Sequence, residues 1–168
     1  MRMLLINCIS GINKLHQWNN SNYWSLSFTD AHELTQSSDS SSNCSIKASL
    51  KKRMDASKCF VLIVGNSTNT VTAGSCSLCG RYNSHTYACA KKRSVDYRSY
   101  IKYECDKAVE AGIKIIVLYK STTVNKSKCP EAVKNRGVHA PMCYRTADGK
   151  LYWDYASVKQ AFDDSDNS

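Results

Sequence analysis

The carboxylate of Glu104 lies on the wrong side of the helix that the sequence predicts for it. Residues 99–112 (SYIKYECDKAVEAG) have the pattern of an amphipathic helix that ends at a glycine, before the apolar run IKIIVLY. At about 100° per residue, Glu104 falls within the apolar arc, whereas Lys102 and Asp106 share the opposite arc. A carboxylate that faces a sheet is paired with a cation, hydrogen-bonded, or placed in a cleft that uses its charge. The position alone leaves a structural salt bridge and a functional role equally open.

Thiols and one imidazole form a second candidate site, within residues 66–96. Cys76 and Cys79 form a CxxC pair, and His85 and Cys89 follow it. A thiolate pair with this spacing can bind one tetrahedral zinc ion, and a further Cys or His can complete the ligand set. Three alternatives remain, namely a structural zinc, a redox pair, and a loop with inert thiols. The redox pair has the least support, because the CxxC does not open a helix after a strand.

The nine cysteines do not indicate a full disulfide framework. Their number is odd, and Cys8, Cys59 and Cys105 lie in predicted strands or helices, where a free cysteine is a small buried hydrophobe. The N-terminus has no secretory signal pattern, and no apolar run is as long as a membrane span. We therefore expect a cytoplasmic protein with no membrane partner.

The formal net charge of +9 favours an anionic partner, either a nucleic acid or a small molecule that carries phosphate. Short basic clusters occur at residues 51–53 and 91–93, and the first is most simply the solvated face of a helix. Neither cluster is interleaved with aromatic residues that could stack on bases. The sequence therefore gives no support for nucleic-acid binding, which would also predict a steep dependence on salt.

Strand-like and helix-like segments alternate along the chain. MLLINCI, SLSFT, CFVLIVG and IKIIVLY are strand-like, and helical segments are expected at residues 12–18, 45–58, 99–112 and 148–162. This alternation predicts an α/β fold of three layers, in which a central parallel sheet is covered on both faces. Ligands bind such sheets beyond the carboxyl ends of the strands. The helix of Glu104 and the serine-rich loop at residues 36–43 can both approach that edge.

The length suits one domain spanning residues 1–168. The cysteine-containing segment at about residues 66–96 reads as an insertion, since the strand and helix pattern breaks there. Residues 163–168 are acidic and polar, and we expect this tail to fray.

Several segments together resemble the bacterial TIR-like family that includes the Thoeris antiphage protein ThsB. These segments are FTDAHEL, SIKASLKKRMDASKCFVLIVGNST and SYIKYECDKAVEAGIKIIVLY, with looser matches in CPEAVKNRGVHAPM and YWDYASVKQAF. They follow one another in the order of the family and cover most of the chain from residue 18 onward. The resemblance implies a flavodoxin-like fold.

The resemblance also implies cleavage of NAD as the substrate. Enzymatic members carry an essential glutamate on the helix before the fourth strand, and Glu104 in YECDKA matches it. Tyr100 takes the place of the aromatic residue that often precedes this glutamate by one turn. Ser10 in MLLINCISG and Asp30 in FTDAHEL are implied as nucleotide-pocket residues, although the first stretch has neither the aromatic nor the acidic residue that is usual there. Turn capping for Asp30 and a surface loop position for His32 are the simpler alternatives.

Two functional hypotheses follow from the resemblance. The first is a signalling NAD hydrolase of antiviral defence, which releases a linear or cyclic ADP-ribose product that acts on a partner effector. The second is a non-catalytic TIR-like module that acts by protein assembly, including self-association, or by nucleotide binding.

Overall fold

Five parallel strands form the central sheet of the protein. The computed structural model describes residues 1–6, 9–24, 26–31, 42–90 and 92–166. The sheet has the order β2-β1-β3-β6-β7 and consists of β1 (Arg2–Ile6), β2 (Thr29–Asp30), β3 (Cys59–Val64), β6 (Lys114–Tyr119) and β7 (Val138–Pro141). This is the flavodoxin-like strand order, so the predicted fold class is confirmed.

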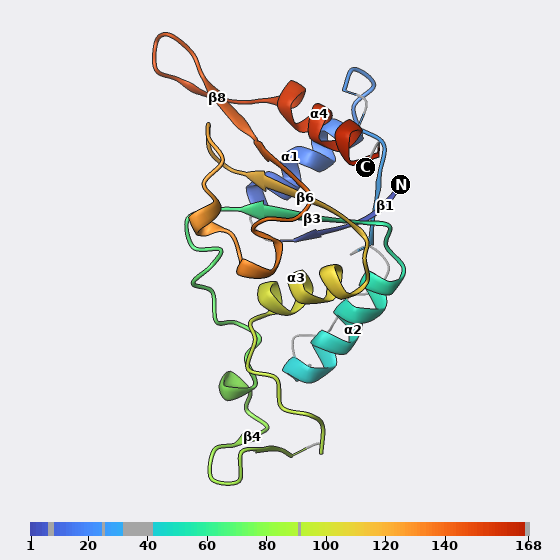
Figure 1. Cartoon of the computed structure of the whole chain (residues 1–168), viewed down its shortest axis with the longest axis vertical. Helices are drawn as coiled ribbons and strands as arrows, with labels where there is room; N and C mark the ends of the chain where they lie inside the picture. Colours follow the sequence, from blue (N-terminus) through green and yellow to red (C-terminus); the bar gives the residue numbers. More distant parts are fainter. Residues whose placement is uncertain (7–8, 25, 32–41, 91, 167–168) are drawn as a thin grey trace.

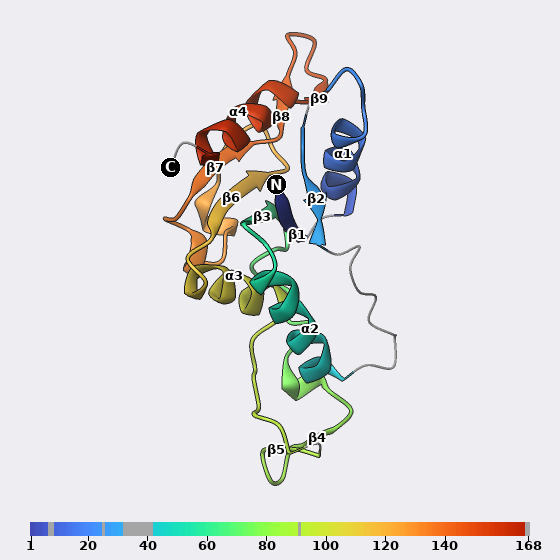
Figure 2. The same ribbon diagram turned by 90° about the vertical axis from the view of Figure 1, so that its right-hand side faces the viewer.

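Helices cover both faces of this sheet (Figures 1 and 2). The helices α1 (Ile9–Asn19) and α4 (Tyr155–Asp166) lie on one face, and α2 (Asn43–Asp55) and α3 (Tyr100–Glu110) lie on the other. Side chains alternate between the two layers, as a strand requires. Val61 and Ile63 of β3 belong to the core beside α1 and α4, whereas Phe60 and Leu62 belong to the core beside α2 and α3. The continuous apolar run of β3 is thus explained by burial on both faces.

The predicted second strand differs from the observed one. The strand β2 contains only Thr29 and Asp30. The backbone of Phe28, just before it, is hydrogen-bonded by the side chain of Asn19 instead of by a neighbouring strand. Asn19 Oδ1 accepts from the amide of Phe28 at 2.8 Å, and its Nδ2 donates to the Phe28 carbonyl at 3.0 Å. Leu26 and Phe28 are buried all the same. Their apolar character therefore reflects packing in the core and not membership of the sheet.

The carboxyl-terminal third contains elements that the sequence pattern did not reveal. The strand β7 follows the 3-10 helices η3 (Lys126–Lys128) and η4 (Glu131–Val133), and β8 (Cys143–Arg145) pairs with β9 (Leu151–Trp153) in an antiparallel hairpin. The predicted closing helix therefore begins only at Tyr155. It also continues past the point where fraying was expected, because Ser165 is buried and its hydroxyl donates to the Phe162 carbonyl at 2.7 Å.

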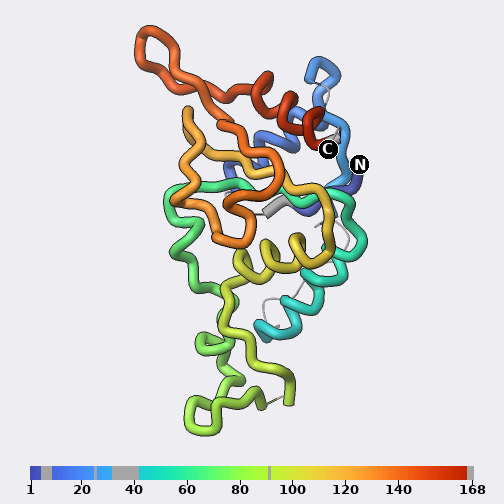
Figure 3. Tube along the Cα trace, viewed as in Figure 1, coloured from blue at the N-terminus to red at the C-terminus, as the bar shows by residue number. Residues whose placement is uncertain are grey.

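The insertion after β3 extends away from the sheet, beyond α2 and α3 (Figure 3). It contains the 3-10 helix η2 (Cys76–Leu78) and a small antiparallel hairpin of β4 (Tyr82–Asn83) and β5 (Ala88–Cys89). No helix within the described residues is long and apolar enough to cross a membrane.

Candidate functional site

Glu104 lies on the buried face of α3, as its position on the apolar arc predicted. The helix begins after Ser99, whose hydroxyl accepts from the amide of Lys102 at 3.2 Å, and it ends before Gly112, whose φ is +62°. Only 4% of Glu104 is exposed, and Ile101 and Cys105 beside it are also buried. The helix therefore places the carboxyl group of Glu104 in the buried layer between α3 and the rest of the protein.

For a buried acid, the carboxyl group of Glu104 has few interactions that offset its removal from water. Within the described residues, its Oε1 atom has no hydrogen-bond partner. Burial raises the pKa of Glu104 to about 8, and the positive charge of Arg53 opposes this rise. Arg53 comes from α2 and is itself only 9% exposed. The basic cluster at residues 51–53 is thus solvated at Lys51 and Lys52, but the prediction was wrong for Arg53.

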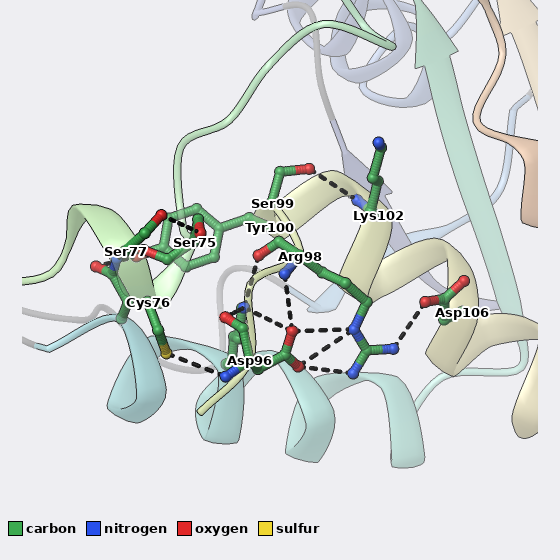
Figure 4. A network of polar contacts seen from close by, with 11 residues as sticks. Ser75, Cys76, Ser77, Asp96, Arg98, Ser99, Tyr100, Lys102 and Asp106 are labelled. Carbon is green, nitrogen blue, oxygen red and sulfur yellow. Dashed lines mark hydrogen bonds and ion pairs between the residues drawn. The ribbon is translucent and has the colours of Figure 1, made fainter. Parts of the chain in front are cut away.

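A network of charges fixes the segment that leads into α3 (Figure 4). Lys47 of α2 is 4% exposed, and its ammonium group donates to the carbonyl oxygens of Asp96 at 3.0 Å and Arg98 at 2.6 Å. It also lies 3.2 Å from Asp96 Oδ1. The Arg98 guanidinium donates to the Asp96 carboxylate at 2.6 Å and to Asp106 of α3 at 2.7 Å. These contacts tie the end of the insertion to both helices.

The charges of this network are mutually stabilising. Burial alone would raise the pKa of Asp96, but hydrogen bonds from Arg98 and Lys47 hold it well below its ordinary range. Hydrogen bonding to Asp96 in turn raises the pKa of Arg98. The ring of Tyr103 lies under both cations, 5.5 Å from Lys47 Nζ and 5.0 Å from the Arg98 guanidinium carbon.

Tyr100 contacts the insertion and α2. Its hydroxyl donates to Asn43 Oδ1 at 3.0 Å, and Asn43 Nδ2 donates to the Ser75 carbonyl at 2.8 Å. Gly74 has a φ of +98°, and a Cβ atom there would lie 2.5 Å from the Tyr100 ring. The tyrosine therefore packs closely against the insertion. A role for Tyr100 in nucleotide binding stays a prediction.

The four predicted zinc ligands are all described but do not form a ready metal site. Cys76 and Cys89 are buried, Cys79 is half-buried, and His85 is exposed. Among the described residues, no three His, Cys, Asp or Glu side chains are arranged to hold a metal ion. Zinc binding by these residues stays a prediction.

A further thiol, Cys44, lies in the first turn of α2 beside Ser42. Burial alone would raise the pKa of Cys44, but a hydrogen bond with Ser42 and the charge of Arg93 outweigh this effect, so its pKa lies below the ordinary value. Its Sγ atom lies 3.2 Å from Ser42 Oγ.

The other predicted pocket residues lie near the amino-terminal strands. Asp30 is 6% exposed in β2, and its Oδ2 lies 3.1 Å from Nε2 of His16 in α1. Ser10 is exposed in the first turn of α1. His32 lies outside the described residues, together with the rest of residues 32–41 and residues 7–8, so the approach of the serine-rich segment to Glu104 stays a prediction.

Three clefts lie elsewhere on the described surface. One of about 350 Å³ opens on the polar side of α3 and is lined by Arg98, Lys102 and Asp106, together with residues of η4. A second, of about 680 Å³, lies along Ser94 to Arg98. The third, of about 560 Å³, lies beside Gly112, Arg136 and Ser165. Glu104 lines none of these three.

Sequence reasoning missed the buried cations, although a signal for them was present. The buried face of α2 consists of Lys47, Leu50, Arg53 and Met54, so two basic residues occupy helical spacing with two apolar ones. The basic cluster at residues 51–53 was instead assigned to the solvated face of this helix. A basic residue three positions from a core leucine, on either side, was the available signal.

Comparison with known families agrees with the resemblance in the first half of the chain. Residues 9–73 match the family described as "Thoeris protein ThsB, TIR-like domain". The matched segment contains Ser10 and Asp30 and ends before the insertion cysteines and Glu104. None of the curated proteins compared with the chain matches it. Over residues 9–73 the chain is thus similar in sequence to the TIR-like domain of the Thoeris protein ThsB, and its five-stranded parallel sheet with helices on both faces is consistent with a TIR-like fold.

Proposed function

We propose that this protein is a TIR-like module of antiphage defence that cleaves NAD at the bond between nicotinamide and ribose. The observation that carries the proposal is the buried carboxyl group of Glu104, with an oxygen that has no hydrogen-bond partner in the described structure. A purely structural glutamate at 4% exposure would be expected to have both oxygens satisfied. Buried acids with strongly shifted pKa values concentrate at functional sites.

The chemistry suits a single fixed carboxylate. The bond between ribose C1′ and the nicotinamide nitrogen breaks, and its electron pair neutralises the charge of the nicotinamide ring. The ribose is left as an oxocarbenium-like centre, which the carboxylate of Glu104 would stabilise. Water or a hydroxyl of the same nucleotide then attacks C1′ and loses a proton, which gives a linear or a cyclic product. No strong general acid is needed, because nicotinamide leaves as a neutral molecule.

Arg53 would keep Glu104 usable as an anion. Burial favours the protonated carboxyl group, and the guanidinium of Arg53 is the charge that opposes this effect. The net charge of +9 also favours the approach of the NAD pyrophosphate. The product would serve as a messenger for a partner effector. Since Glu104 is only 4% exposed, catalysis requires an activated form in which the substrate reaches it, and self-association is one route to such a form.

A non-catalytic TIR-like module is the second candidate. The low exposure of Glu104 and the charge of Arg53 near it favour this alternative, because a buried pair can hold α2 against α3.

Incubation with NAD separates the two candidates. Mass spectrometry of the purified chain with NAD, and of cells that express it under phage challenge, should detect nicotinamide and an ADP-ribose-type product. If both preparations leave NAD intact, the catalytic proposal is wrong and the non-catalytic module takes its place.

A further inference from the structure

The insertion after β3 has a surplus of positive charge. Residues 66–95 contain Arg81, Lys91, Lys92 and Arg93, but neither Asp nor Glu. The side chains of Arg81, Lys92 and Arg93 are exposed, and none of the three forms an ion pair within the described residues. Surface cations without acidic partners raise the local concentration of anions, so this segment favours an anionic partner.

The hairpin of the insertion brings Arg81 next to the basic cluster at residues 91–93. The amide of Ala90 donates to the Arg81 carbonyl at 2.9 Å, so Arg81 lies opposite the residue that precedes the cluster. The amide of Lys92 donates to the Cys89 carbonyl at 2.8 Å, which turns the chain immediately after β5. Cations that are separate in the sequence therefore share the end of the insertion that projects from the sheet (Figure 3).

Three tyrosines lie on the same part of the insertion. Tyr82 follows Arg81, and its hydroxyl oxygen lies 2.9 Å from that of Tyr97. The two ring centroids are 6.0 Å apart and the rings are nearly perpendicular, at 87°. Tyr97 is 54% exposed, and Tyr87 on the hairpin is 72% exposed. Aromatic rings and cations, which do not alternate along the sequence, thus lie side by side in the fold.

Tyr87 has a backbone conformation that an aromatic residue rarely adopts. Its φ is +51°, in the left-handed region where Gly and Asn are more usual. Because most of its side chain is exposed, packing of the ring offsets little of this strain. A strained residue whose ring the fold hardly uses points to a role in binding.

A cleft of about 680 Å³ leads from the insertion toward α3. It is lined by residues 94–98 and by Lys102, so Tyr97 forms part of its wall. The one acidic residue of the cleft, Asp96, is neutralised by Arg98 at 2.6 Å. Lys102 is exposed and forms no ion pair within the described residues. An anionic chain can therefore continue from the hairpin into this cleft.

We propose that the insertion binds single-stranded nucleic acid. Arg81, Lys92 and Arg93 contact phosphate groups, and the rings of Tyr87 and Tyr97 stack on bases. Cations alone would attract any polyanion, but exposed aromatic rings beside them favour one that carries unstacked bases. An acidic peptide has no rings in its charged side chains, and the bases of a duplex are already stacked on one another.

Fluorescence anisotropy of the full chain with a fluorescein-labelled oligothymidylate tests this proposal. We expect saturable binding that weakens steeply as salt rises, and weaker binding of a duplex of the same length. Arg81→Gln should reduce the slope of log affinity against log salt by roughly 0.7, the value for one phosphate of a single strand. Lys52→Gln removes the same charge from the exposed side of α2 and should leave the slope unchanged.

Tyr87→Asn separates base stacking from charge. Asparagine tolerates the left-handed backbone, so this variant removes the ring and keeps the conformation of the hairpin. It should weaken oligothymidylate binding by about tenfold with an unchanged salt slope. Tyr23→Asn, which removes an 82% exposed ring from the loop after α1, should have no effect.

Four results would overturn the proposal. They are the absence of binding at low salt, equal affinity for the duplex or for polyglutamate, an unchanged salt slope in Arg81→Gln, and unchanged affinity in Tyr87→Asn. None of these measurements depends on NAD cleavage.

Discussion

Glu104 combines three properties that rarely coexist in a structural glutamate. It is almost fully buried, one of its oxygens lacks a hydrogen bond in the described structure, and a buried arginine acts on it through its charge. Removing a carboxylate from water is costly unless close partners compensate it. The site therefore favours the neutral carboxyl group in the free protein, and ionisation costs stability.

The first prediction concerns stability and pH. Because the pKa of Glu104 is raised from 4.5 to about 8 on folding, the folded chain retains a proton that the unfolded chain loses between these values. The stability of the parent protein should therefore fall as pH rises from 5 to 8, and Glu104→Gln should lack this loss. Over this pH interval, the free energy of unfolding of the variant should rise relative to that of the parent by roughly 1–3 kcal/mol, as measured by urea unfolding.

Glu110→Gln is the matched control for this measurement. Glu110 is an exposed glutamate on the same helix and pairs with Lys107, so its removal should not reproduce the slope. A Glu104→Gln variant that becomes progressively less stable than the parent as pH rises would instead identify a stabilising ion pair with Arg53.

Arg53 provides a second prediction at the residue scale. Its charge lowers the pKa of Glu104, so Arg53→Gln should raise that pKa further. If the carboxylate is the active form, the rising limb of kcat/KM for NAD should move to higher pH by about one unit. Lys52→Gln removes an exposed neighbouring charge and should leave the profile in place. An unshifted profile in Arg53→Gln would show that the two groups are not coupled in catalysis.

At the scale of elements, α2 and α3 are joined by buried cations as well as by apolar packing. Lys47 satisfies two carbonyl groups and a carboxylate of the segment before α3, and Arg98 connects that segment to Asp106. Breaking such a network leaves several polar groups buried without partners. The start of the helix that carries Glu104 therefore depends on a lysine more than fifty residues earlier in the chain.

Lys47→Met tests the importance of this network. Methionine fills similar volume but cannot satisfy the carbonyl groups of Asp96 and Arg98, so we expect a loss of about 3 kcal/mol in the free energy of unfolding. Lys51→Met on the exposed side of α2 should change stability little, since its pair with Asp55 is in solvent. Equal losses in the two variants would show that the buried contacts of Lys47 contribute no more to stability than the exposed pair of Lys51.

Two glycines test how closely β7 approaches β6. Gly137 and Gly149 both have positive φ angles, of +70° and +84°. A Cβ atom at Gly137 would lie 2.0 Å from the carbonyl oxygen of Ile115, whereas nothing lies within 4 Å at Gly149. Gly149→Ala should cost about 1 kcal/mol through backbone strain alone, and Gly137→Ala should cost at least twice as much in the same unfolding measurement. Similar losses would mean that the backbone at Gly137 can move away.

For the whole molecule, short-range sequence patterns were sufficient to predict the features that depend only on neighbouring residues, namely most strands and helices. The apolar runs of β1, β3 and β6 and the helical spacing of α2 and α3 were sufficient for the parallel sheet and its layers. The position of Glu104 on the buried face followed from helical geometry alone. The strand β7 was missed because VHAP is short and contains a proline.

The site depends on contacts that no local pattern encodes. Asn19 replaces strand pairing at Phe28, Lys47 reaches Asp96, and Arg53 acts on Glu104 across two helices. Each contact joins residues whose proximity arises only from the packed fold. The helix α2 illustrates this limit of sequence patterns. The charges of Lys47 and Arg53 suggested exposed side chains, but both are buried beside acidic residues that are distant in the sequence.

Release of nicotinamide from NAD by the parent protein, Glu104→Gln and Glu110→Gln tests the proposed catalytic role most directly. The measurement uses bacteria that express each variant at equal levels, with and without phage challenge, and mass spectrometry to quantify nicotinamide and ADP-ribose-type products. Glu104→Gln keeps the size and polarity of the side chain but removes its charge, so it should abolish product formation while Glu110→Gln retains the parent rate. Turnover of NAD by Glu104→Gln at the parent rate would contradict the assignment of Glu104 as the catalytic residue.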